Sequence, residues 1–239
     1  MKEIENELSK IIQIISEVFP ETLKSIILYG SWAKGTAREK SDIDLLFVFS
    51  SLNDENNRRI HDLTIRIDTS HILDIVSASV EDFEKEKIPL FTAIKKEGRI
   101  VFGECNMEIS NVEPKIKYRE FFFRSKNFET SKIKMVEKIK EEDSFYSGIG
   151  LCYSASKHAI QASLAMKGEG YSSKIRVLLP LCEKYFGRNI ADSFRKLFNL
   201  YVKSEYTLEV PTESESNLAL LLAKEIIKVY EIIEKELDI

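Results

Sequence analysis

The chain has 239 residues, of which 44% are hydrophobic and 31% charged, so it has enough apolar material for one large domain or two smaller ones. Its net charge of −4 argues against a protein that coats nucleic acid, although a local basic patch remains compatible with it. Cys105, Cys152 and Cys182 are widely spaced without a C-x-x-C pairing, which favours a reducing compartment and argues against a zinc site. The sequence shows neither a signal-peptide core nor an apolar run of membrane-spanning length, so we expect a cytoplasmic protein outside the membrane.

The first hundred residues alternate between helical and strand patterns, which indicates a mixed sheet with helices. Apolar residues recur every three or four positions in the first segment, and Pro20 ends that predicted helix. Asn53 or Asp54 caps the helix predicted over residues 53–66. We predict helices over residues 2–19, 53–66 and 80–86, and strands over residues 25–29, 45–49, 70–78 and 98–103.

A Gly-Ser break follows the first predicted strand. Glycine lets the backbone approach a ligand closely, and the N–H groups at such a break can face an anion. Gly30 and Ser31 are therefore candidate anion-binding residues. Lys34 lies in the loop that follows and is a candidate contact for a triphosphate. The alternative for Lys34, as for Arg38 and Lys40, is a solvated loop.

Two carboxylates stand just before and within the second predicted strand. If residues 42–49 are extended, period two puts Asp42 and Asp44 on one face, about 7 Å apart. Like charges at that distance repel unless a positive charge lies between them. Mg²⁺ or Mn²⁺ would supply it, because hard cations take oxygen ligands and leave room for phosphate oxygens. The alternative is that Asp42 opens the strand from a turn and Asp44 is a solvated strand residue.

The segment GSWAKGTAREKSDIDLLFVF, residues 30–49, resembles the nucleotidyltransferases of the polymerase-beta superfamily, especially the minimal nucleotidyltransferase group. The motif of that group is an apolar strand, Gly-Ser, a short spacer and Asp-apolar-Asp. The resemblance implies a nucleoside triphosphate substrate, expected to be ATP, with its phosphates against Gly30 and Ser31. It also implies that Asp42 and Asp44 hold the metal.

Asp74 lies between Leu73 and Ile75 in the strand predicted over residues 70–78, where a charge is costly without a partner. In the resembling family a third carboxylate on a neighbouring strand completes the metal site. The resemblance therefore implies Asp74 as the third catalytic and metal-binding residue. An edge-strand aspartate facing water is the alternative, and Asp68 is a weaker substitute because it falls at the turn before the strand.

The pattern changes after about residue 104. Residues 105–114 lack clear periodicity and are predicted to be a linker between a domain over residues 1–104 and an all-α domain over residues 115–239. Short connections between long helices favour an up-and-down bundle. The predicted fold is thus α+β, with an N-terminal mixed-sheet nucleotidyltransferase domain followed by a helical bundle. We predict its helices near residues 116–142, 144–167, 173–186, 189–206 and 214–237.

The helical half resembles the HEPN family of nucleotide-binding helical bundles. Its segment YSASKHAIQASLAMKG, residues 153–168, has that family's pattern of small and aromatic residues on a long helix that ends at a glycine. HEPN ribonucleases carry Arg, four to six residues, then His. His158 is the only histidine of this half, and residues 151–153 lack the arginine, so we do not expect a ribonuclease. Arg66 and His71 have the spacing but lie in the first domain, and we interpret that match as chance.

A basic stretch opens the helical half. Residues 114–140 contain nine Lys or Arg against three Glu, with aromatic residues interleaved. The stretch can be an anion-facing wall or an RNA contact. Helical spacing favours the alternative, a bundle helix with a buried aromatic face and a solvated basic face.

Together the carboxylate motif and the two resemblances imply transfer of AMP from ATP to an acceptor hydroxyl. The acceptor stays open between a small molecule such as an aminoglycoside, a protein hydroxyl and, less favoured, an RNA end. The competing hypothesis is a non-catalytic, antitoxin-like module that binds nucleotide. A homodimer formed through the helical domain is expected in either case.

Overall fold

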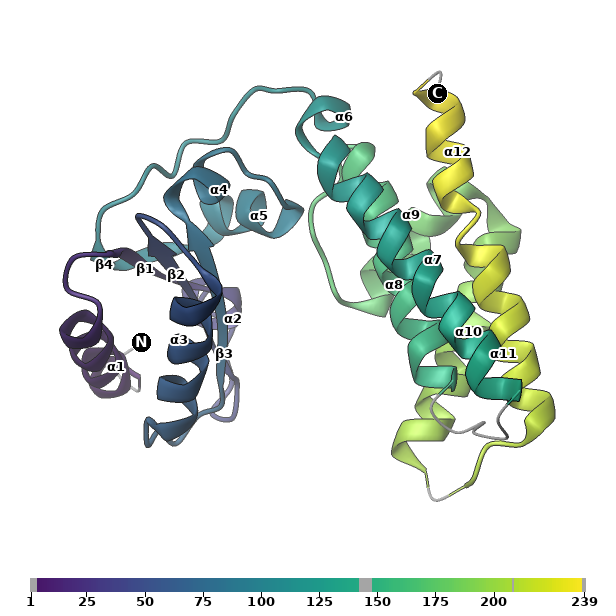
Figure 1. The fold of residues 1–239 in the computed structure, drawn as a ribbon, viewed down its shortest axis with the longest axis horizontal. Helices are drawn as coiled ribbons and strands as arrows, with labels where there is room; N and C mark the ends of the chain where they lie inside the picture. The colour runs from purple at the N-terminus through teal and green to yellow at the C-terminus, as the bar shows by residue number, and fades with distance from the viewer. Residues whose placement is uncertain (1–3, 142–147, 208, 238–239) are drawn as a thin grey trace. The chain divides into compact units, whose positions relative to one another are not determined.

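The computed structural model describes residues 4–141, 148–207 and 209–237. Contacts divide the chain into two units, Met1–Asn111 and Val112–Ile239 (Figure 1). Each unit has its own buried apolar core. The division falls within the predicted linker, and the predicted domain boundaries stay a prediction.

The first unit is built on a four-stranded mixed sheet with the strand order β3-β2-β1-β4. Neighbouring strands are antiparallel in the pairs β1–β2 and β1–β4 and parallel in the pair β2–β3. The two central strands are long apolar runs because helices cover both of their faces. The strands are β1 (Leu23–Tyr29), β2 (Ile43–Phe49), β3 (Leu73–Ser79) and β4 (Arg99–Gly103).

In the described part of the first unit, five helices accompany this sheet: α1 (Glu5–Val18), α2 (Gly30–Ala33), α3 (Asp54–Arg66), α4 (Val80–Glu84) and α5 (Pro89–Glu97). Along β2, the odd-numbered residues pack with α1 and α3, whereas Leu46 and Val48 pack with α4 and α5. Since side chains alternate along a strand, Asp44 belongs to the face that carries Leu46 and Val48. The sheet thus directs Asp44 away from the core under α1 and α3.

A buried ion pair fixes the segment that leaves β4. Lys95 on α5 lies 3.3 Å from Glu86, and their side chains are 1% and 0% exposed. Lys95 also donates to the carbonyl of Glu108 at 2.8 Å, while Glu86 accepts from the backbone N–H of Ser110 at 2.7 Å. The chain is therefore held to the first unit as far as Ser110.

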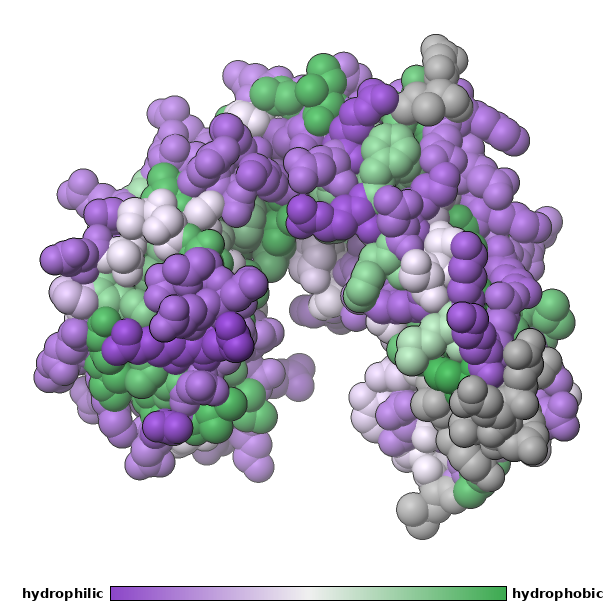
Figure 2. Space-filling model, in the orientation of Figure 1, coloured by the Kyte–Doolittle hydropathy of each residue, from purple (hydrophilic) through white to green (hydrophobic). Residues whose placement is uncertain are grey.

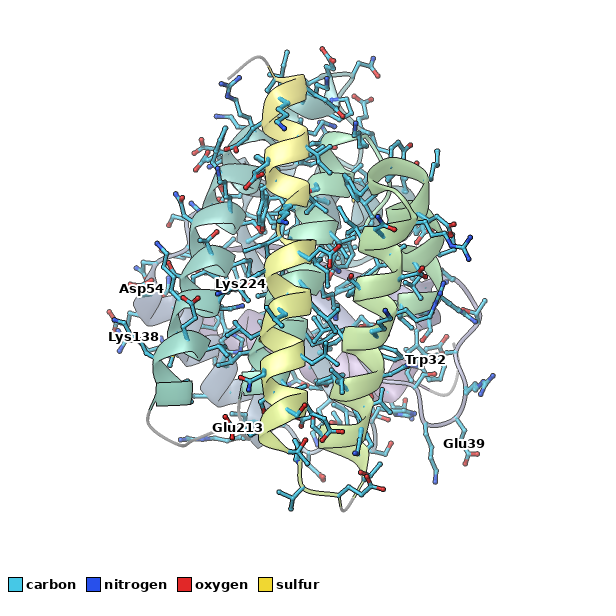
Figure 3. The ribbon with its side chains drawn as sticks, turned by 90° about the vertical axis from the view of Figure 1, so that its right-hand side faces the viewer. Trp32, Glu39, Asp54, Lys138, Glu213 and Lys224 are labelled. Atoms are coloured by element: carbon cyan, nitrogen blue, oxygen red, sulfur yellow. The ribbon has the colours of Figure 1, made fainter. Side chains whose placement is uncertain are left out.

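The second unit is a helical bundle around α8 (Gly148–Met166). Most of α8 is buried, and its alanines Ala155, Ala159 and Ala162 let neighbouring helices approach closely. The other helices are α6 (Pro114–Lys117), α7 (Arg119–Glu141), α9 (Ile175–Phe186), α10 (Arg188–Tyr206), α11 (Glu213–Ile226) and α12 (Val229–Glu236). Figure 3 shows α11 and α12 following one another along the bundle, with Glu213 at the beginning of α11 and Lys224 further along it.

The predicted fold class is confirmed, with a mixed sheet followed by a helical region. The helix predicted over residues 214–237 is instead two helices. Ile227 and Lys228 form a turn between them, because the N–H groups of Lys228 and Tyr230 bond three residues back and tighten the backbone. Residues 144–147 of another predicted helix lie outside the described part of the chain. Within the described ranges, no helix is long and apolar enough to cross a bilayer.

Candidate active site

Asp44 lies between residues of two neighbouring strands. The parallel register of β2 and β3 pairs it with Asp74, and the antiparallel register of β1 and β2 pairs it with Tyr29. Paired residues on adjacent strands are about 5 Å apart and point to the same face of the sheet. Asp42 lies immediately before β2 and is exposed, as is Asp74, whereas Asp44 is partly buried. Strand pairing therefore brings together two carboxylates that are far apart in the sequence.

Gly30 lies directly against the Asp44 carboxylate. Its φ is +67°, in the left-handed region, and a Cβ at this position would stand 2.0 Å from Oδ2 of Asp44. Any side chain would meet the carboxylate, so the contact requires glycine. Ser31 follows at the start of α2, and its backbone N–H donates a hydrogen bond to Asp44. The predicted Gly-Ser break thus contacts Asp44, one of the two predicted carboxylates.

The electrostatics of Asp44 show that negative charge accumulates here. Burial, followed by the charges of Asp74 and Asp42, raises the pKa of Asp44 to about 6, while the N–H of Ser31 acts in the opposite direction. All three carboxylates therefore interact, with Asp44 between the other two. A bound cation would offset this repulsion.

The residues present suit a hard divalent cation, since Asp42, Asp44 and Asp74 offer only oxygen donors. In the described ranges no three potential ligands lie close enough together to form a ready metal site. The metal assignment accordingly stays a prediction that fits the donor set.

Lys34 follows α2, and its ammonium forms an ion pair with Glu97 at the end of α5. Both side chains are about half exposed, so solvent screens the pair and it stabilises little. Arg38 and Lys40 are exposed in the same loop. A triphosphate contact for Lys34 stays a prediction, and it would require exchange of Glu97 for phosphate.

Asp68, the weaker substitute for Asp74, lies in the turn before β3. Its backbone carbonyl accepts a hydrogen bond from Lys10 at 2.8 Å, and it lines a shallow cavity of about 360 Å³ beside α1. The register of β3 pairs Asp74, not Asp68, with Asp44. The geometry thus favours Asp74 as the third carboxylate.

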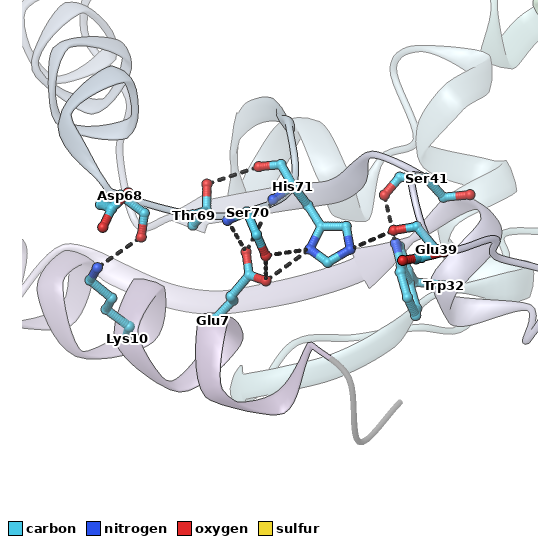
Figure 4. A network of polar contacts seen from close by, with 9 residues as sticks. All are labelled: Glu7, Lys10, Trp32, Glu39, Ser41, Asp68, Thr69, Ser70 and His71. Carbon is cyan, nitrogen blue, oxygen red and sulfur yellow. Dashed lines mark hydrogen bonds and ion pairs between the residues drawn. The ribbon is translucent and has the colours of Figure 1, made fainter.

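A polar network beside this site was not predicted from the sequence (Figure 4). Glu7 on α1 contacts His71, and His71 contacts the backbone of Glu39 in the loop that leads to Asp42. Trp32 on α2 packs edge-on against His71 with ring centroids 5.5 Å apart. No pattern along the chain connects Glu7 with His71, because 64 residues separate them.

In the bundle, His158 contacts Glu129, with Nδ1 and Oε1 3.1 Å apart. The aromatic residues of the basic stretch differ in burial: Tyr118 and Phe122 are buried, while Phe128 is 61% exposed. Figure 2 shows apolar side chains among the hydrophilic ones on the face that carries α7.

Comparison with known proteins shows two consecutive families. Residues 9–106 match the family described as Polymerase beta, Nucleotidyltransferase, and residues 127–233 match the HEPN domain. The "Putative protein adenylyltransferase MJ1305" of Methanocaldococcus jannaschii is 30% identical over 125 residues, which are 48% of this chain and 85% of that protein. The chain belongs to the polymerase-beta nucleotidyltransferases. A HEPN domain follows its nucleotidyltransferase domain.

The fold of this nucleotidyltransferase is similar to that of the spectinomycin adenyltransferase AAD(9) from Enterococcus faecialis, solved with ATP and spectinomycin. The TM-score is 0.51 at 12% identity, and the match covers 92% of this chain and 98% of that one. At this identity the likeness concerns the fold alone. The predicted family and its nucleotidyl-transfer activity are confirmed, while the metal and the acceptor are not decided by these comparisons.

Proposed function

We propose that this nucleotidyltransferase moves AMP from ATP to a hydroxyl group, with Asp42, Asp44 and Asp74 as the catalytic and metal-binding residues. The observation that carries this proposal is the pairing of Asp44 with Asp74 while Gly30 lies against the Asp44 carboxylate. This arrangement places acidic oxygens beside a strand-to-helix turn whose N–H groups can face phosphate.

The roles of the side chains follow from their positions. Asp42, Asp44 and Asp74 would hold Mg²⁺ or Mn²⁺, which supplies charge stabilisation to the phosphates and activates the acceptor hydroxyl. Gly30 and Ser31 would receive the β- and γ-phosphates, and Lys34 would neutralise part of their charge. Asp74, which is exposed, would also take a proton from an incoming hydroxyl.

A protein hydroxyl is the acceptor that we favour, because the relative from Methanocaldococcus jannaschii is named as a protein adenylyltransferase. A small molecule and an RNA end are the alternatives that the experiment below separates. The cytoplasmic location and the homodimer stay predictions, and light scattering on the purified protein checks the second.

The proposal is tested with α-labelled ATP and Mg²⁺, with and without cell extract. We expect label on a protein, abolished by EDTA and reduced at least about 100-fold in Asp42→Asn and in Asp44→Asn, because each change removes charge stabilisation from the transition state. Asp62→Asn is the matched control, since Asp62 is exposed on α3. Label on a small molecule or on RNA would show that this molecule, and not a protein, is the acceptor. Full transfer in the Asp42 or Asp44 variant would contradict the site.

A further inference from the structure

Glu7 and His71 connect three segments of the first unit at one point. The Glu7 carboxylate on α1 lies 2.8 Å from Nδ1 of His71 and accepts from the hydroxyl of Ser70 at 2.7 Å and from its N–H at 3.1 Å. Nε2 of His71 lies 3.0 Å from the carbonyl oxygen of Glu39 (Figure 4). The side chains of His71 and Glu7 are only 12% and 15% exposed, so these contacts are largely protected from water.

The loop held in this way leads directly to Asp42. Trp32 donates from its indole nitrogen to the carbonyl of Ser41 at 3.1 Å, and the Ser41 hydroxyl accepts from the N–H of Arg38 at 2.8 Å. Asp42 follows Ser41 and precedes β2, so strand pairing does not begin until the next residue. The position of the Asp42 carboxylate therefore depends on the loop as well as on the sheet.

The two contacts of His71 determine which of its ring nitrogens act as hydrogen-bond donors. A carboxylate and a backbone carbonyl only accept hydrogen bonds, so the two contacts of His71 exist together when both ring nitrogens carry a proton. Burial tends to raise the pKa of Glu7, but hydrogen bonds from Ser70 and His71 outweigh it and hold the pKa below its usual value. The charged carboxylate is thus the form that the network selects.

We propose that Glu7 and His71 are positioning residues of the metal site, which act by fixing the loop over residues 36–42 and with it Asp42. The inference rests on the proposed metal role of Asp42. His71 holds the Glu39 carbonyl, Glu7 holds His71, and Trp32 holds Ser41, so the loop is attached on both sides of its last turn.

Two substitutions of His71 separate the two contacts. Asparagine places an amide N–H near the position of Nδ1 and keeps the contact with Glu7, whereas glutamine places it near Nε2 and keeps the contact with Glu39. His61→Asn is the matched control, because His61 is exposed on α3. Glu7→Gln is a second, independent variant, since its amide would direct a donor toward the N–H of Ser70 or His71.

The readouts are binding of Mn²⁺ alone, followed by electron paramagnetic resonance, and amide hydrogen exchange over residues 36–42. We expect His71→Asn and Glu7→Gln to weaken Mn²⁺ binding about tenfold, the factor that corresponds to one hydrogen bond, and to speed exchange in the loop. His71→Gln keeps the donor to the Glu39 carbonyl but loses the contact with Glu7, so we expect a smaller loss of Mn²⁺ affinity and a smaller rise in loop exchange than in His71→Asn, while His61→Asn should stay close to the wild type.

Unchanged Mn²⁺ affinity and loop exchange in both His71→Asn and Glu7→Gln would overturn the positioning role. An equal loss of Mn²⁺ affinity in His71→Gln and His71→Asn would show that the contact of His71 with the Glu39 carbonyl does not position the loop. If the wild-type protein transfers AMP but binds no Mn²⁺ at these carboxylates, the proposed metal site is wrong. Glu7 and His71 would then not be positioning residues of a metal site. If His71→Asn fails to fold, Glu7→Gln decides the outcome.

Discussion

At the scale of single residues, the approach of Gly30 to Asp44 leaves no room for a side chain at position 30. The backbone of Gly30 is in the left-handed region, and the space where a Cβ would stand is taken by the Asp44 carboxylate. The sequence shows a glycine and an aspartate there, but not that they touch.

Gly30→Ala therefore tests the contact. We expect loss of AMP transfer, because the new methyl group displaces the Asp44 carboxylate, together with a destabilisation above the roughly 1 kcal/mol of a left-handed alanine. Gly35→Ala is the matched control, since Gly35 also has a positive φ, +70°, but nothing lies within 4 Å of its Cβ position. Transfer assays and urea unfolding measure both effects. Equal losses in the two variants would show that backbone strain alone is responsible.

At the scale of elements, most helices and strands could be predicted from the sequence, because their apolar periodicity is strong. The helix α5 was not among the predicted helices. Pro89 at its first turn and Lys95 and Lys96 at its last turn are the local features that favour that helix. The buried role of Lys95 had no local signal, because Lys is usually exposed.

The Lys95–Glu86 pair supports a prediction at this scale. Lys95→Met removes the ammonium beside a carboxylate that is 0% exposed, so we expect the free energy of unfolding to fall by about 3 to 5 kcal/mol in urea titrations. Lys96→Met is the control, because Lys96 is exposed, and a change within about 0.5 kcal/mol is expected there. A loss below about 1 kcal/mol for Lys95→Met would mean that the pair contributes little.

At the scale of the whole molecule, the chain has two separate sets of core residues. The clusters around the sheet contain residues of the first unit only, and the cluster around α8 contains residues of the second unit only. Units with separate cores are expected to open as separate cooperative units.

Matched core truncations test this independence. Phe47→Ala in β2 and Phe194→Ala in α10 each remove a fully buried ring, at a cost of about 3 to 5 kcal/mol. Hydrogen exchange followed by mass spectrometry should show lost protection in the unit that carries the substitution and unchanged protection in the other. If either substitution deprotects both units, the two cores are coupled.

The sequence by itself determined the α+β order, the family and the candidate residues Gly30, Ser31, Asp42 and Asp44, because these signals are local in the chain. Asp74 was also favoured over Asp68 from the sequence, but its pairing with Asp44 required the register of β2 and β3. Likewise the network of Glu7 and His71 exists only after α1, β3 and the loop before Asp42 have come together. Strand pairing and side-chain contacts between distant segments leave no periodic trace in the sequence, and for this reason only the tertiary structure decided them.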